Sequence, residues 1–287
     1  MKAFGSYNPL TLFLYFLSVI LISAFLQNPV LTVSALCGAI LFSAALSRRR
    51  ERLSDIAFYI PLFLLVAVTN PLFSHNGQTP LFFLNGNAVT LEALFYGVGL
   101  AVAVCGVMLW CKCFGKIMTA DKTLYLFGKT LPKISVVISC AMRFIPLFTS
   151  RAQKAMGLYS SKGIVDRVRG ACRVFVSMIA WSLESSMQTA MSMKARGSGL
   201  SGRTRFSLFR FYPRDGVLLA ATVCLVGLSV VGSAPGAVDF YYYPKVSQIP
   251  LSPLSVAVYI AFAALSLIPF AVEIKEAIVW KYSVSKI

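Results

Sequence analysis

One arginine stands where a helix is expected to end, in the stretch MSMKARGSGLSGRTRF at residues 191–206. A helix-compatible run there carries Lys194 and Arg196 and stops at Gly197. A guanidinium group is planar and has five donors, so it can bind carboxylate or carbonyl oxygens in a bidentate manner. The ordinary alternative is a helix stop, in which glycine relieves the strain of a left-handed C-cap and basic residues complement the helix dipole. The sequence around Arg196 is compatible with both interpretations.

The rest of the sequence carries no pattern typical of catalysis or metal binding. Its seven cysteines include no C-x-x-C pair, and His75 is the one histidine of the chain, which argues against a metal site. We interpret the cysteines as small apolar side chains. The sequence contains no H-E-x-x-H motif, no Walker A loop and no pair of intramembrane aspartates. We therefore predict no catalytic residue, no metal site and no enzymatic activity.

The composition of the chain indicates that this arginine belongs to a helical membrane protein. Of the 287 residues, 57% are apolar, and the mean hydropathy is +0.75, beyond the usual range of soluble domains. About six windows are long and apolar enough to cross some 30 Å of hydrocarbon. These windows are residues 9–26, 30–46, 56–73, 91–111, 216–233 and 254–272. The sequence thus predicts an all-α integral membrane protein with about six transmembrane helices.

The net charge of +17 has a topological explanation. With the N-terminus inside, 26 of the 27 lysines and arginines fall in segments predicted to be cytoplasmic, and only Lys245 falls outside. This bias follows the positive-inside rule, so we expect a multi-pass protein of the cell membrane with both termini in the cytoplasm. A nucleic-acid-binding protein would need a soluble basic surface instead. The lipid bilayer is therefore an expected partner, and nucleic acid is not.

The basic middle of the chain divides the sequence into three predicted regions. Residues 1–111 form an N-terminal membrane region with four spans, and residues 216–287 form a C-terminal membrane region with two spans and a cytoplasmic tail. Residues 112–215 are basic and still rich in apolar side chains, which predicts two long amphipathic cytoplasmic helices with a break at 160–163. The second helix has an apolar face that recurs at three- and four-residue steps. This face consists of Val168, Cys172, Phe175, Ile179, Leu183, Met187 and Ala190.

Short motifs along the chain carry a resemblance to a known family. They are NPLFSH at 70–75, TLEALFYG at 90–97, RFIPLF at 143–148, RAQKAMG at 151–157 and KARG at 194–197. In their order, and in the layout of spans around a long helical segment, they resemble the transmembrane T component of energy-coupling factor (ECF) transporters, the EcfT/CbiQ-like family. The resemblance runs over nearly the whole chain.

The resemblance implies a coupling scaffold that performs no chemistry. Members of the family join two cytoplasmic ABC-type ATPase subunits to a small membrane protein, the S component, which binds a vitamin or a transition-metal ion. ATP is bound by the ATPase subunits, so no cofactor is expected on this chain. In the family, two coupling helices each end in a short Ala-Arg-Gly or Ala-Arg-Ser motif that lies in a groove of one ATPase.

The family's docking motifs fall at the predicted ends of the two long helices. The second motif matches the family in full and consists of Ala195, Arg196 and Gly197. The first consists of Ala155, Met156 and Gly157. It departs from the family because Met156 holds the position of the arginine. Either nearby positive charge compensates for the missing arginine, or Met156 packs into an apolar groove. The supporting charges are Arg151, Lys154 and Lys194.

The alternative function is that of a self-sufficient secondary transporter or channel, which requires other features in the sequence. Such proteins need ionisable residues or broken helices at membrane depth. The predicted spans contain almost none, since Glu92 lies at a span edge and Asp55 and Asp215 lie at or beyond boundaries. The coupling scaffold is therefore the favoured interpretation, and the secondary transporter is the alternative.

Overall fold

The computed structural model describes most of the chain. The described residues are 3–47, 49–74, 77–84, 87–130, 132–157, 164–198, 200, 209–233, 236 and 238–284. His75 and the predicted break at 160–163 lie outside them. The chain forms two compact units, one made of Met1–Thr119 with Phe211–Ile287 and the other of Ala120–Arg210.

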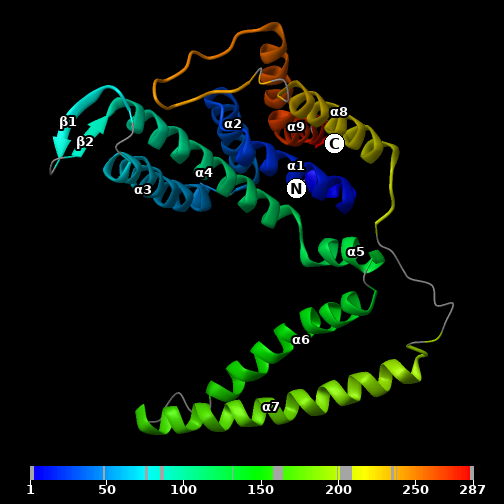
Figure 1. Cartoon of the computed structure of the whole chain (residues 1–287). Coiled ribbons are helices and arrows are strands. Elements are labelled where there is room, and N and C mark those ends of the chain that lie inside the picture. Colours follow the sequence, from blue (N-terminus) through cyan, green and yellow to red (C-terminus); the bar gives the residue numbers. More distant parts are fainter. Residues whose placement is uncertain are drawn as a thin grey trace. The chain divides into compact units, whose positions relative to one another are not determined.

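The described part of the first unit consists of helices, one short hairpin and an irregular loop between the last two helices (Figure 1). Its helices are the 3-10 helix η1 (Phe4–Ser6), α1 (Pro9–Phe25), α2 (Pro29–Leu46), α3 (Arg49–Phe73), α4 (Leu91–Ile117), α8 (Pro213–Ser233) and α9 (Pro253–Val284). Strands β1 (Pro80–Leu84) and β2 (Asn87–Thr90) form an antiparallel pair between α3 and α4. The second unit contains α5 (Ala120–Thr130), α6 (Pro132–Gly157) and α7 (Ile164–Ala195).

The prediction of an all-α multi-pass membrane protein is confirmed. Within the described residues, six helices are long and apolar enough to cross a membrane. They are α2, α3, α4, α8, Pro253–Ser283 of α9, and Ile134–Gly157 of α6. The set differs from the predicted windows in two members, because α1 has only 17 residues and α6 qualifies by composition. Several helices also continue beyond their apolar windows, as α4 does through Lys112 and Lys116.

Two helices of the first unit begin at an Asn-Pro pair. Asn8 caps α1 by accepting a hydrogen bond from the N–H of Leu10 at 3.1 Å. Asn28 caps α2 in the same way, with the N–H of Val30 at 3.0 Å. Asparagine is a strong N-cap, and proline at the first helical position has its φ already set for a helix. These two pairs therefore set the helix starts that the sequence predicts within one residue.

An aromatic cluster forms the core of the first unit. Phe4, Phe16 and Trp110 are fully buried, and Trp110 lies 6.1 Å from Phe16 between ring centroids. The buried polar atoms of this cluster are hydrogen-bonded. Trp110 Nε1 donates to the carbonyl of Ala35 at 3.0 Å, and Tyr15 Oη donates to the carbonyl of Leu265 at 2.7 Å. Because both carbonyls belong to other helices, these bonds tie α4 to α2 and α1 to α9.

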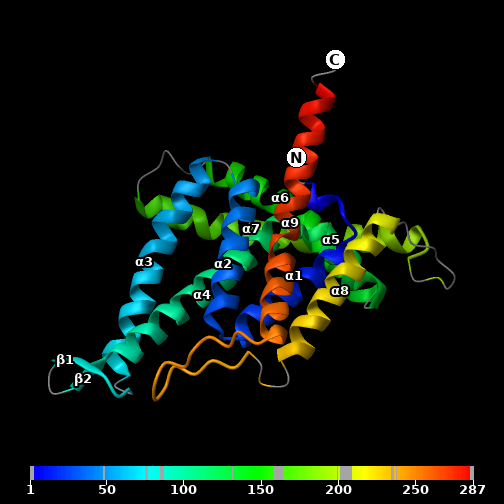
Figure 2. The ribbon, with the colours of Figure 1, turned by 90° about the horizontal axis from the view of Figure 1, so that it is seen from above.

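Two carboxylates anchor the N-terminal segment to the two last helices by accepting hydrogen bonds from backbone N–H groups. Asp215, in the first turn of α8, accepts hydrogen bonds from the N–H of Asn8 at 2.9 Å and of Tyr212 at 2.8 Å. Glu273 of α9 accepts one from the N–H of Phe4 at 3.1 Å. Beyond Glu273, α9 extends past the other helices of this unit (Figure 2).

The C-terminal half of α3 packs closely on α4 at Gly97. A Cβ atom at Gly97 would lie 2.7 Å from the carbonyl oxygen of Ala67 and 3.2 Å from Pro71 Cδ. Real Cβ atoms do not approach so closely, so this position requires glycine for the two backbones to meet. Ala67 and Pro71 are the buried residues of α3.

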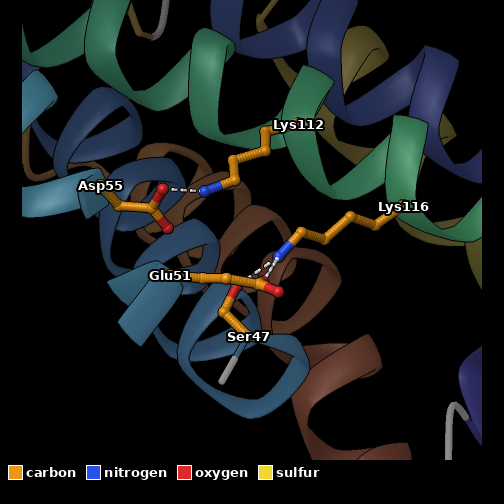
Figure 3. Close-up of polar contacts among 5 residues, drawn as sticks. All are labelled: Ser47, Glu51, Asp55, Lys112 and Lys116. Carbon is orange, nitrogen blue, oxygen red and sulfur yellow. Dashed lines mark hydrogen bonds and ion pairs between the residues drawn. The ribbon is translucent and has the colours of Figure 1, made fainter. Parts of the chain in front are cut away.

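The opposite end of α3 is joined to α4 by charged side chains. Figure 3 shows Lys112 pointing at Asp55, and Lys116 reaching both Glu51 and Ser47. Lys116 Nζ lies 2.6 Å from Glu51 Oε2 and 2.7 Å from Ser47 Oγ. The acids are four residues apart on α3 and the lysines are four apart on α4, so each pair lies on one helix face. The two pairs therefore form an antiparallel ladder of ion pairs.

Candidate docking site on the second unit

The site predicted from the sequence lies on the hairpin of α6 and α7. On α7, Val174 and Met178 are buried and lie on one face of the helix. Trp181 continues the same face at a three-residue step and is half-buried. In Figure 1, α6 ends beside the start of α7, and the two helices diverge toward the other end of α7. The hairpin therefore presents two separate helix ends.

Trp181 makes the most specific contact between the two helices. The ring of Phe144 stacks on it with a centroid separation of 5.2 Å and an interplanar angle of 18°. The guanidinium carbon of Arg151 lies 4.6 Å from the ring centroid of Trp181, within range of a cation–π interaction. Arg151 is one of the predicted supporting charges for Met156, and the structure places it against α7.

The end of α7 has the hydrogen bonds of a Schellman motif. Gly197 has a φ of +76°, its N–H donates to the carbonyl of Lys194 at 3.0 Å, and the N–H of Ser198 donates to the carbonyl of Met193 at 2.9 Å. In this motif Gly197 takes the left-handed position and Arg196 is the C-cap residue. The helix stop predicted at Gly197 is therefore confirmed. Arg196 is also exposed, so its guanidinium is free to meet a partner.

The end of α6 carries the motif without arginine. Met156 is 42% exposed, Ala155 is half-buried, and Lys154 is exposed in the last turn of the helix. A Cβ at Gly157 would meet nothing within 4 Å, so a partner surface can approach closely here. Met156 and Lys154 thus present an apolar and a cationic side chain side by side.

The structure separates the two motifs. Arg196 lies fifteen residues, about 22 Å, beyond Trp181 on α7, whereas α6 runs in the opposite direction and carries Met156 past Trp181 toward the start of α7. Lys194 and Ala195 lie with Arg196 at the far end of α7 and are exposed. One partner pocket cannot hold both motifs, so the geometry suits two grooves.

The apolar face predicted for α7 is exposed and not buried against α6. Its described large side chains, together with Met191, are between 44% and 68% exposed. We call this surface the apolar stripe, and it consists of Phe175, Ile179, Leu183, Met187 and Met191. It runs for about 24 Å and winds slowly around the helix, because steps of four residues exceed one turn. An exposed apolar surface of this length suits contact with another protein or with lipid.

The sequence could not decide which apolar face of α7 is buried. Val174 and Met178 are as apolar as Phe175 and Ile179, and both sets recur at helical spacing. The signal that was missed lies on α6, where Phe144 and Arg151 are seven residues apart and so share one face. That face meets Trp181.

The buried acidic residues of the described chain lie near helix ends. Among the described residues, no group of three His, Cys, Asp or Glu side chains is placed to hold a metal ion. The buried carboxylates Glu92 and Asp215 lie in the first turns of α4 and α8. Glu92 accepts hydrogen bonds from Thr79, including one from its hydroxyl at 2.8 Å. Both carboxylates therefore hold backbone and loop in place near helix ends.

Comparison with known proteins supports the resemblance. The chain is 28% identical over 223 residues to the energy-coupling factor transporter transmembrane protein EcfT of Brevibacillus brevis. The matched region covers 70% of this chain and 83% of that protein. It is 29% identical over 118 residues to EcfT of Lactobacillus helveticus, covering 38% of this chain and 43% of that protein. For EcfT of Streptococcus thermophilus the identity is 30% over 112 residues, with 36% and 42% covered.

These matches differ in extent. The regions matched in the Lactobacillus and Streptococcus proteins span less than half of those relatives, whereas the Brevibacillus match is long. No protein-family model matches the chain. The matches agree with the order of the motifs and with the multi-pass helical fold. These similarities support the interpretation of the chain as an EcfT-like transmembrane T component.

Proposed function

We propose that this chain is the coupling scaffold of an ECF-type importer. Two cytoplasmic ABC-type ATPase subunits dock at the ends of α6 and α7, and a small substrate-binding membrane protein, the S component, packs on the hairpin. The ATPases bind the ATP, and this chain has no catalytic residue or cofactor of its own. The transported solute is a vitamin or a transition-metal ion held by the S component.

The observation that carries this proposal is the surface of α7. One helix combines an exposed apolar stripe with an exposed arginine at its C-cap. The arginine suits a groove lined by carboxylate or carbonyl oxygens. The stripe suits an apolar helix surface, and its methionines adapt to different partners. One continuous helix can therefore bind two kinds of partner surface.

A continuous rod can transmit motion between those partners. The 32 residues of α7 contain no proline, and proline is the commonest cause of a sharp helix kink. When ATP binding closes the ATPase pair, Arg196 and Met156 move with their grooves, so the hairpin tilts as a body. The S component on the apolar stripe tilts with it, which reorients its substrate site. This is a two-state mechanism that both partners bias.

The positions of the buried charges favour coupling over a self-contained transporter. A secondary transporter needs ionisable residues or unwound helices near the bilayer midplane. In the described spans, Glu92 lies in the first turn of α4 and Asp215 in the first turn of α8. Both carboxylates accept hydrogen bonds from backbone N–H or hydroxyl groups.

Co-purification from the native membrane tests the proposal. The tagged full chain should recover two ABC-type ATPases, or one used twice, together with a small membrane protein. Arg196→Glu should reduce ATPase recovery more than tenfold, because a desolvated charge pair contributes about 2–5 kcal/mol. Met156→Glu should weaken the other contact.

Arg143→Glu is the matched control, since Arg143 is an exposed arginine of α6 outside both motifs. It should leave ATPase recovery unchanged. Wild-type protein that recovers no ATPase under gentle solubilisation would contradict the proposed function. Equal losses with Arg143→Glu and Arg196→Glu would show that the effect is one of net charge and not of docking.

A further inference from the structure

We infer that Trp181 is the positioning residue that sets the angle between α6 and α7, because Phe144 and Arg151 clasp its ring. We call these three residues the tryptophan clasp. The clasp itself stands on contacts within the second unit. Its consequence for coupling rests on the proposed function.

Phe144 and Arg151 both contact the indole of Trp181. They are seven positions apart on α6, which separates their backbones by about 10.5 Å along the helix axis. The ring of Phe144 lies 5.2 Å from the Trp181 ring, and the guanidinium carbon of Arg151 lies 4.6 Å from its centroid. Two turns of α6 therefore contact one ring, and α7 can neither slide along α6 nor rotate away without breaking one of these contacts.

The position of the clasp along α7 gives it control over the angle. Val174 and Met178 are buried before it on the same helix face, and none of the described residues of α7 after Trp181 is buried. The two helices diverge toward the C-terminal end of α7 (Figure 1), and among the described residues Trp181 makes the last ring contact with α6 along this direction. Fourteen residues separate it from Ala195, a lever of about 21 Å.

A small change at the clasp is therefore large at the docking end. A tilt of about 10° at Trp181 would move the end of α7 by roughly 4 Å, given the rise of 1.5 Å per residue. Such a displacement is comparable to one helical turn, enough to move Arg196 out of a groove. The clasp makes the two docking ends move as one body, which coupling requires.

Distance measurements between spin labels test the clasp without any partner. Labels carried by non-canonical amino acids at Val137 of α6 and Met191 of α7 replace exposed side chains on the diverging arms. They also avoid the seven native cysteines. The full chain in lipid nanodiscs should give one narrow distance distribution.

Three variants separate the clasp from general destabilisation. Arg151→Gln should raise the population outside the wild-type distance range about two- to fivefold, the factor expected from losing an exposed cation–π interaction. Trp181→Leu leaves every charge in place and should broaden the distribution as well. Arg151→Lys retains a cation above the ring and should restore most of the narrow distribution. Arg143→Gln, on the same helix, should have no effect.

The outcomes distinguish this inference from the proposed function. A wild-type distribution in both Arg151→Gln and Trp181→Leu would overturn the clasp, as would equal broadening by Arg143→Gln. In co-purification, Arg151→Gln should keep more ATPase than Arg196→Glu. A loss as complete as that of Arg196→Glu, with an unchanged distance distribution, would make Arg151 a docking contact and overturn the inference. If wild type recovers no ATPase, the proposed function fails, and the distances still decide the clasp.

Discussion

Replacing Asp215 by alanine tests whether a buried carboxylate anchors the chain where it re-enters the membrane unit. Asp215 is 3% exposed and accepts from the N–H groups of Asn8 at 2.9 Å and Tyr212 at 2.8 Å. Leaving the buried Asn8 N–H without an acceptor costs about 1–3 kcal/mol. Tyr212 is exposed, so water replaces its partner and only about 0.5–1.5 kcal/mol is lost. The expected loss of unfolding free energy is about 1.5–4.5 kcal/mol.

Reversible unfolding in mixed micelles with increasing SDS, followed by far-UV circular dichroism, measures this loss. Asp215→Asn retains one acceptor oxygen, so it should lose roughly half as much as Asp215→Ala. Asp239→Ala is the matched control, because Asp239 is an exposed acid in a loop of the same unit, and its removal should change stability by less than about 0.5 kcal/mol. If Asp215→Ala unfolds at the same SDS fraction as Asp239→Ala, the anchor does not exist.

The same unfolding assay tests three further features of the first unit. Gly97→Ala should lower the unfolding free energy by about 1–3 kcal/mol, because the added methyl group overpacks against α3. Gly115→Ala should raise it by up to about 1 kcal/mol, because a Cβ there meets nothing within 4 Å. Equal effects of the two substitutions would refute the close approach at Gly97. A double-mutant cycle of Asp55→Asn and Lys112→Met should give a coupling of about 0.5–1.5 kcal/mol, modest because both side chains are partly exposed, and a coupling of zero would dismiss the ion pair. Burial raises the pKa of Tyr242 above its ordinary value of 10.0, so its contribution to stability is complete below about pH 10 and is lost as the pH rises through the raised pKa. Tyr242→Phe should weaken the alkaline loss of stability, and an unchanged slope above pH 10 would contradict this.

The local parts of the fold follow from the sequence. The apolar windows at 9–26 and 30–46 begin within one residue of α1 and α2, and Gly197 predicts the end of α7, because helix ends depend on neighbours in the chain. The spans were predicted less accurately where charged residues continue a helix. Lys112 and Lys116 end the apolar window near residue 111, although backbone hydrogen bonds carry α4 on to Ile117.

The contacts between distant segments did not follow from the sequence. Asp55 and Lys112 are 57 positions apart, and no local pattern pairs them. On α7 two apolar faces compete, and only the packing of Phe144 and Arg151 against Trp181 decides which face is buried. The same packing assigns Arg151 to the hairpin, where the sequence alone suggested a charge for the docking end.

Site-specific photo-crosslinking in the native membrane tests the central claim most directly. A photoreactive amino acid replaces Leu183 on the apolar stripe, Ser198 beside the exposed end of α7, or Lys245 in an exposed loop of the other unit as the control. The account predicts a small membrane protein crosslinked at Leu183, an ABC-type ATPase at Ser198, and neither protein at Lys245. Lipid alone at Leu183 together with no ATPase at Ser198 would contradict the claim that this chain couples ATPases to a membrane partner.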